Sequence, residues 1–166
     1  MTESSVVHAE RLVDCPFSIA AEHAADALRE LEAGTGGLIV RVPLKAVGLP
    51  LPGTVRHRVR LTFGIHSFDQ DNTRRGHDEI RFTWRAQSRW LPDLAGTLSF
   101  TVASHRATRL TLEGAYQPPL GLSGTLFDAV LGWRFAAATA ADLVARVSAA
   151  MESAERAFRA AHPMVP

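Results

Sequence analysis

The side chain that the sequence places best for acid–base chemistry is His57. Residues alternate with a period of two in the segment 54–68, "TVRHRVRLTFGIHSF", and His57 falls on the face that otherwise carries apolar side chains. A neutral imidazole inside an apolar space can act as a general base or donate a hydrogen bond to a ligand. A histidine near a strand end that only bonds backbone or water is the simpler interpretation, and the sequence leaves both open.

Tyr116 is the one tyrosine of the chain and lies just before a Pro-Pro pair. Its hydroxyl can orient a ligand at the base of a cavity, or its ring can pack in the core while the hydroxyl bonds a loop carbonyl. Trp84 and Trp133 can stack on a planar ligand, although core packing also explains them. These aromatic residues are therefore candidates for ligand contact.

Two charged residues and the single cysteine complete the set of candidate side chains. Asp128 and Arg134 lie six positions apart, about 240° around a helix, so they do not share a face. Arg134 can meet a ligand carboxylate, although pairing with a sheet carboxylate such as Glu113 is simpler. Cys15 is next to Pro16 and has no activating base visible in the sequence, so we expect an inert thiol.

Motifs for cofactor binding are missing from the sequence. The seven histidines are scattered, and none has another His, Cys or carboxylate at a recognisable metal-ligand spacing. A phosphate loop, a dinucleotide fingerprint and a G-x-S-x-G motif are also absent. The sequence therefore predicts no metal, no cofactor and no assigned catalytic residue.

Composition and charge are those of an ordinary globular chain. The 166 residues fit one domain, residues 1–166, with 46% hydrophobic and 21% charged residues. The formal net charge of +1 gives no general attraction to nucleic acid. No apolar run reaches the roughly 18 residues that stable membrane insertion needs. A single cysteine and an N-terminus unlike a signal peptide favour a reducing, cytoplasmic location.

In the middle of the chain, apolar and polar residues alternate with a period of two. This pattern predicts strands, which would position the candidate side chains. Four such segments, joined by short turns, predict an antiparallel meander with one buried and one exposed face, and two shorter strands precede it. The exposed face of the first meander strand carries Arg56, Arg58 and Arg60. We expect these arginines to pair with cross-strand carboxylates, with contact to an anionic partner as the alternative.

Two helices are predicted. The segment 18–33 has an apolar stripe and begins at Ser18, which can cap it. The segment 123–158 carries apolar residues at spacings of three and four. At 1.5 Å per residue it would be about 50 Å long, so it must overhang the sheet or bend, for example near Gly132. Because the Pro-Pro pair ends the last strand, this helix can lie back across the buried face of the sheet.

The middle of the long helix has small side chains. Residues 136–141 read "AAATAA", between larger residues on either side. Small side chains opposite large ones on the sheet can leave a cavity, bordered by Ala137 and Ala140, or can mean close helix packing. If the packing is close, we expect a ligand site nearer to the loop 45–53, "KAVGLPLPG".

Three segments of the chain resemble the START-like, or SRPBCC, superfamily. They read "WRAQSRWLPDLAGTL", "LTLEGAYQPPLG" and "FDAVLGWRFAAATAADLV", and the resemblance extends from about Val6 to Met151. It implies an α+β helix-grip fold, with a curved antiparallel sheet of about six or seven strands wrapped around a long C-terminal helix. The superfamily includes lipid carriers, polyketide cyclases, plant hormone receptors and ring-hydroxylase domains, so the fold does not select one function.

We therefore expect a small hydrophobic or lipid-like ligand in an apolar cavity between the sheet and the C-terminal helix. The alternative is an enzyme of the polyketide cyclase or dehydrase type that uses the same cavity and takes His57 or Tyr116 for proton transfer. A third class is an interaction module that docks a partner on its exposed sheet face or C-terminal overhang. A monomer or a homodimer fits these functions. The residues expected to contact the ligand are His57, Val59, Leu61, Phe63, Phe82, Trp84, Phe100, Leu112, Tyr116, Trp133, Ala137 and Ala140.

Overall fold

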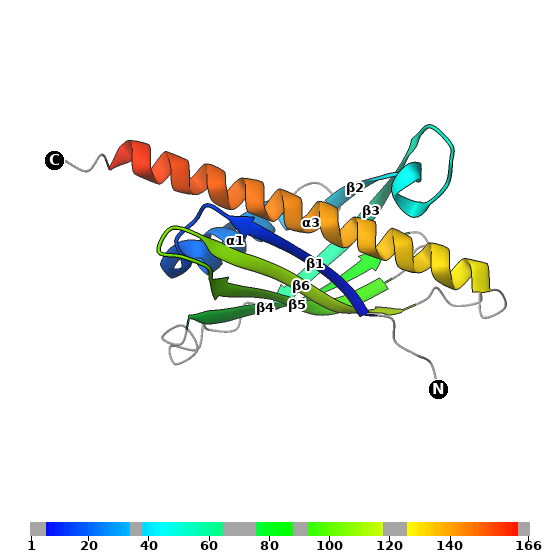
Figure 1. Cartoon of the computed structure of the whole chain (residues 1–166), viewed down its shortest axis with the longest axis horizontal. Coiled ribbons are helices and arrows are strands. Elements are labelled where there is room, and N and C mark those ends of the chain that lie inside the picture. Colours follow the sequence, from blue (N-terminus) through cyan, green and yellow to red (C-terminus); the bar gives the residue numbers. More distant parts are fainter. Residues whose placement is uncertain (1–5, 34–37, 65–75, 88–92, 118–125, 163–166) are drawn as a thin grey trace.

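The elements follow one another in the order expected from the sequence (Figure 1). The computed structural model describes residues 6–33, 38–64, 76–87, 93–117 and 126–162. The predicted strand end at Pro118 and Pro119, and the first residues of the predicted long helix, lie outside the described residues. The elements are β1 (Val6–Val13), α1 (Phe17–Ala33), β2 (Leu38–Pro43), the 3-10 helix η1 (Leu44–Val47), β3 (Thr54–Gly64), β4 (His77–Ala86), β5 (Asp93–Val102), β6 (Thr108–Gln117) and α3 (Leu126–Ala161).

Six strands form one antiparallel sheet in the order β1-β6-β5-β4-β3-β2. Strands β2 to β6 make a meander, because neighbours in the chain are also neighbours in the sheet. Strand β1 pairs with β6 along its whole length, so the first and last strands among the described residues lie side by side. Together with α1 and α3, this sheet confirms the predicted α+β helix-grip fold.

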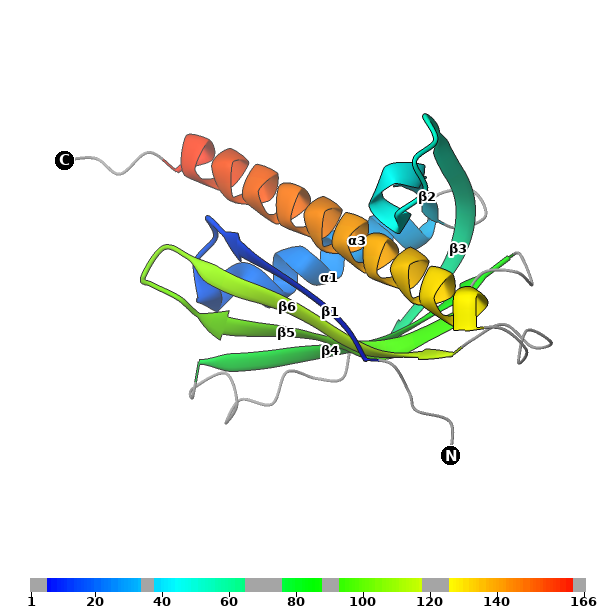
Figure 2. The ribbon, with the colours of Figure 1, turned by 45° about the vertical axis from the view of Figure 1, so that its right-hand side comes forward.

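The sheet curls around a buried face (Figure 2). Gly96 in β5 and Gly114 in β6 lie opposite each other, where a Cβ atom on Gly96 would come within 2.2 Å of the Glu113 carbonyl oxygen. The backbones of the two strands can approach this closely only because neither residue has a side chain.

Large apolar side chains from neighbouring strands meet on the concave face. In β3 and β4, Leu61 lies opposite Trp84 and Phe63 lies opposite Phe82. The rings of Phe82 and Trp84 have centroids 6.0 Å apart, and both side chains are buried. Full burial of such a side chain is worth roughly 1.5–3 kcal/mol, so these pairs hold the sheet to the helices above it.

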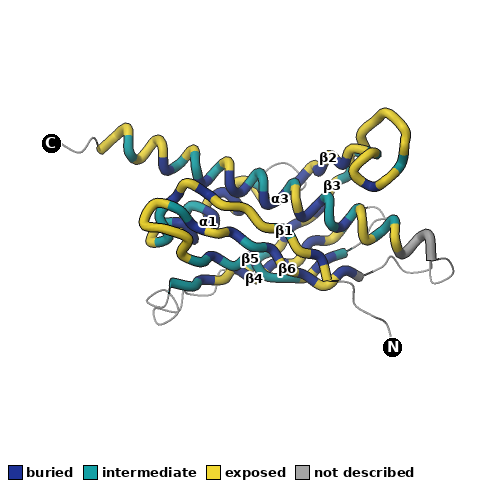
Figure 3. The backbone as a smooth tube through the Cα atoms, viewed as in Figure 1, coloured by how far each residue is buried: buried dark blue, intermediate teal, exposed yellow. Residues whose placement is uncertain are grey.

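Helix α3 is a single helix of 36 residues that crosses the concave side of the sheet (Figure 1). It packs on β1, β2, β6 and α1, while α1 covers β3, β4 and β5. It runs unbroken through Gly132, and its C-terminal end extends beyond the sheet, so of the two expected alternatives, overhang or bend, the overhang is observed. The buried positions gather where the two helices face the sheet, and the last turns of α3 are exposed (Figure 3). No helix in the described ranges is both long and apolar enough to span a membrane.

The exposed face of β2, β3 and β4 is rich in arginine, and the expectation of cross-strand carboxylates is wrong. Arg56 lies opposite Arg41, and Arg60 lies opposite Arg85. Like charges placed directly opposite each other destabilise a sheet. We call this surface the arginine face, and its exposed members are Arg41, Arg56, Arg58, Arg60, Arg81 and Arg85.

Candidate functional site

Eight of the twelve predicted contact residues belong to one buried apolar cluster between the sheet and the helices. Their exposed fractions of 0–5% leave almost no room for water beside them. His57, Phe63 and Ala137 are half-buried at the margin of this cluster, and Trp133 is exposed. The eight residues are Val59, Leu61, Phe82, Trp84, Phe100, Leu112, Tyr116 and Ala140.

His57 in β3 bonds across the interior to α3. Its Nε2 atom lies 3.2 Å from the hydroxyl oxygen of Thr139, which itself donates to the Phe135 carbonyl oxygen over 2.7 Å. Because the Thr139 proton is already used, the imidazole donates through Nε2–H, and its Nδ1 atom carries a lone pair. That Nδ1 atom is buried and has no hydrogen-bond partner among the described residues.

The electrostatic setting keeps His57 neutral. Burial lowers the pKa of His57 below its usual value, and the nearby Asp142 carboxylate opposes this only in part. A neutral ring with a free Nδ1 lone pair can accept a proton or a hydrogen bond from a ligand. The sequence did not lead us to Thr139, although it is the one polar residue in the segment "AAATAA".

The Tyr116 hydroxyl lies against α3 at Gly132. A Cβ atom on Gly132 would come within 2.2 Å of the hydroxyl oxygen, so glycine at this position makes the space that the hydroxyl occupies. The hydroxyl is buried and has no partner among the described residues, so no bond to a loop carbonyl is observed. Burial raises the pKa of Tyr116, which therefore stays protonated and available as a donor.

Trp133 faces away from the cluster. Trp133 is 41% exposed, and its indole N–H donates to the Val6 carbonyl oxygen over 3.4 Å. This contact ties α3 to the start of the edge strand β1.

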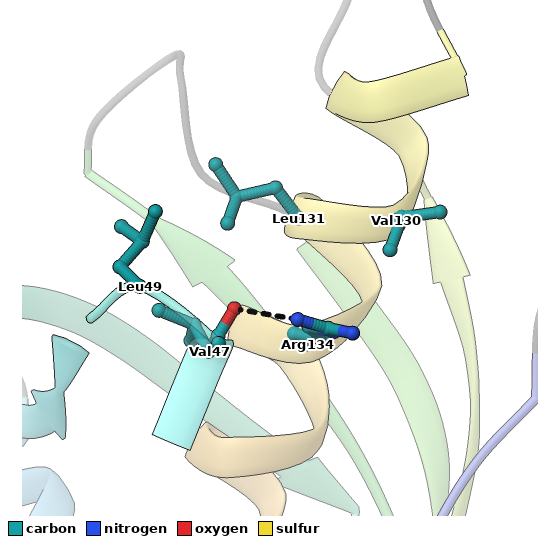
Figure 4. Close-up of a pocket in the computed structure, with 6 residues that line it drawn as sticks. Val47, Leu49, Val130, Leu131 and Arg134 are labelled. Atoms are coloured by element: carbon teal, nitrogen blue, oxygen red, sulfur yellow. Dashed lines mark hydrogen bonds between the residues drawn. The ribbon is translucent and has the colours of Figure 1, made fainter. Parts of the chain in front are cut away.

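A small pocket opens between η1 and the first half of α3 (Figure 4). Its volume is about 50 Å³. It includes part of the segment 45–53 that we expected to be loop, although residues 44–47 form the helix η1. The pocket is lined by Val47, Gly48, Leu49, Val130, Leu131 and Arg134.

Arg134 closes one side of this pocket. Its Nη1 atom donates to the Val47 carbonyl oxygen over 3.2 Å, which joins α3 to η1 (Figure 4). Gly48 ends η1 with a positive φ of 82°, and a Cβ atom there would collide with the guanidinium group. The expected pairing of Arg134 with Glu113 is wrong, because Glu113 lies beside His8 instead. The side chain of Asp128 is outside the described part of the chain.

Cys15 is buried and unsuited to nucleophilic attack. Burial, followed by the negative charge of Glu155, raises the pKa of the Cys15 thiol to about 11. The thiol therefore stays protonated at neutral pH, in agreement with the inert cysteine expected from the sequence.

Comparison with known proteins supports the fold and leaves the chemistry open. No protein-family model matches the chain, and no curated protein matches it. A protein of Thermus thermophilus, TTHA0849, aligns with a TM-score of 0.53 and 14% identity, covering 90% of this chain and 99% of that one. The Zhui aromatase/cyclase from Streptomyces sp. R1128 aligns with a TM-score of 0.53 and 18% identity, covering 95% and 98%. These likenesses support the helix-grip fold that the resemblance implies.

Proposed function

We propose that this chain, which has the helix-grip fold of START-like proteins, binds a small hydrophobic ligand between its sheet and the first half of α3. The observation that carries the proposal is a pair of polar atoms in an apolar interior, His57 Nδ1 and the Tyr116 hydroxyl, which lack partners among the described residues. An unpaired buried polar atom costs roughly 1–3 kcal/mol. A ligand that bonds to these atoms recovers part of that free energy.

The two atoms indicate the chemistry of the ligand. His57 Nδ1 accepts a hydrogen bond, so it suits a hydroxyl or N–H group on the ligand. The Tyr116 hydroxyl can donate to a ligand carbonyl. An apolar body with a few such polar groups, including a lipid-like molecule, fits this interior best.

The ligand must open the interior before it can bind. The pocket of about 50 Å³ is far smaller than the roughly 300–1,000 Å³ of ordinary small-molecule sites. The most direct route lies between η1 and α3, where the bond from Arg134 to Val47 joins the two elements. Release of this one bond would widen the pocket past Leu131 toward Phe135, which packs at the margin of the core.

A polyketide cyclase or dehydrase type of enzyme is the second candidate. The specific observation in its favour is the neutral His57 imidazole with a free Nδ1 atom, which can take a proton from a substrate. The Tyr116 hydroxyl could then stabilise the developing oxyanion. The structural likeness to the Zhui aromatase/cyclase is consistent with this chemistry.

Native mass spectrometry of the protein purified from its own host tests ligand binding. We expect a bound mass at one molecule per chain that is released on unfolding and corresponds to a lipid or an aromatic compound. The proposal would be contradicted if the protein had the same mass under native and unfolding conditions, and if it also took up no ligand when host lipid extract was added back.

A further inference from the structure

A second cluster of chemically active side chains lies far from the pocket, where α1 meets the late part of α3. Cys15 comes from the turn between β1 and α1, His23 from α1, and Glu155 from α3. Glu155 is 21 positions beyond Arg134, about 30 Å along the helix axis. A ligand in the pocket would therefore not reach this cluster.

The three side chains converge on one point. The Cys15 sulfur, one His23 ring nitrogen and one Glu155 carboxylate oxygen all lie within 4.8 Å of one another, and within the described ranges no other such group of three is found. Donor atoms of a tetrahedral zinc site lie about 3.3–3.8 Å apart, given bonds of about 2.0–2.3 Å. Inward movements of about 1 Å would therefore complete the geometry.

Two of the converging groups have an atom that could bind a metal and that makes no hydrogen bond to the described residues. His23 Nε2 and Glu155 Oε2 are buried and have no hydrogen-bond partner among the described residues. Glu155 is only 4% exposed, and such a buried carboxylate oxygen is costly to leave unpaired. A cation bound between these atoms would satisfy both of them.

Neighbouring residues hold two of the three groups in place. Arg159 Nε donates to Glu155 Oε1 over 2.6 Å, while Oε2 has no hydrogen-bond partner among the described residues. The Thr108 hydroxyl donates to the Cys15 carbonyl oxygen over 2.7 Å in a buried contact, which fixes the turn. Outer bonds of this kind orient ligands in metal sites.

We propose that Cys15, His23 and Glu155 form a binding site for Zn²⁺ or a similar tetrahedral transition metal. A thiolate, an imidazole and a carboxylate are the ligand types that zinc takes, whereas Mg²⁺ and Ca²⁺ take oxygen ligands. The Cys15 thiol, which is protonated in the free protein, would release its proton to solvent on binding the metal, so that a thiolate and a carboxylate face the cation. Three protein ligands leave the fourth position to water.

Titration of chelator-treated protein with Co²⁺ tests the site. One equivalent should produce a thiolate-to-cobalt charge-transfer band in the near ultraviolet, with visible bands of tetrahedral intensity. Cys15→Ser should abolish the charge-transfer band. His23→Gln and Glu155→Gln should each weaken Zn²⁺ binding in competition with Co²⁺ by at least about 10-fold.

His162→Gln is the matched control, because His162 is an exposed histidine that follows the same helix α3 and stacks on Phe158. This variant should bind Co²⁺ and Zn²⁺ as the original chain does. The proposal is overturned if the original chain gives no charge-transfer band. It is also overturned if Cys15→Ser and His23→Gln, with unchanged circular dichroism, bind Zn²⁺ as tightly as the original chain.

Discussion

At the scale of single residues, His57 and Tyr116 combine burial with an atom that has no partner among the described residues. His57 uses its Nε2 atom on Thr139 and leaves Nδ1 unused, while Tyr116 leaves its hydroxyl unused at the surface of Gly132. An atom of this kind lowers the stability of the free protein but becomes useful when a ligand supplies the missing bond. In the proposed function, these two residues would link stability to binding.

Protonation of His57 should destabilise the fold at acidic pH. Burial lowers the pKa of His57 in the folded chain, so the unfolded chain binds more protons below about pH 6.5, the ordinary value for histidine. The free energy of unfolding should fall as the pH drops from about 7 toward 5, by less than about 1.4 kcal/mol per pH unit from this one group. Urea unfolding over this pH range should show a flatter dependence for His57→Gln, and parallel curves for the two proteins would contradict the assignment.

Tyr116→Phe separates a carrier from an enzyme. Removing a hydroxyl that has no partner among the described residues should leave stability unchanged or raise it by up to about 1 kcal/mol. Affinity for the apolar fluorescent probe 1-anilinonaphthalene-8-sulfonate should stay within roughly tenfold, or about 1.4 kcal/mol. An enzyme that acts through this hydroxyl would instead lose roughly 10²–10⁴ in rate, and such a loss on any identified substrate would favour the cyclase alternative.

At the scale of elements, the two alanines of the long helix differ. Ala140 is fully buried, whereas Ala137 is half-buried at the margin of the core. The cavity that would border both of them is therefore closed at Ala140 in the free protein. The pocket that the structure shows lies nearer to η1, where we expected a ligand site if the helix packing is close.

Leucine substitutions should show this difference. Ala140→Leu adds three carbons to a filled space and should cost roughly 1–3 kcal/mol of stability. Ala137→Leu should be tolerated, because its side chain can extend at the margin. Thermal melts of the two variants measure this directly. An equal or higher melting temperature for Ala140→Leu would mean that a cavity does border this position.

The arginine face offers a test of the strand register. Arg60 and Arg85 lie directly opposite each other in β3 and β4. Arg85→Glu should replace repulsion with attraction and stabilise the protein by roughly 0.2–1 kcal/mol at low salt. Arg85→Gln, which only removes the repulsion, should give a smaller gain, and salt should reduce both gains. Lower stability for Arg85→Glu in dilute buffer would contradict this pairing.

At the scale of the whole molecule, the features that could be predicted from the sequence are those that depend on local periodicity, namely the inward faces of strands and helices. The period of two in residues 77–86 places Ile80, Phe82 and Trp84 inward, and all three are buried. The apolar spacing in the long helix likewise anticipated its position across the sheet. These features follow from side-chain direction in strands and helices, which a single sequence carries.

Contacts between distant segments could not be predicted in the same way. Cys15, His23 and Glu155 are separated by 8 and 132 positions, and only the crossing of α1 and α3 brings them together. The bond from His57 to Thr139 and the opposition of Arg60 and Arg85 depend on register in three dimensions. No periodicity in one segment contains that information.

The central claim is that a hydrophobic ligand binds between the sheet and the first half of α3. Amide chemical-shift mapping by nuclear magnetic resonance, during titration with 1-anilinonaphthalene-8-sulfonate, tests it most directly. We expect saturable shifts confined to β3 around His57, to η1 and to the first half of α3, including Leu131 and Thr139. Shifts confined to the arginine face or to the exposed end of α3, or no saturable shifts, would contradict the claim.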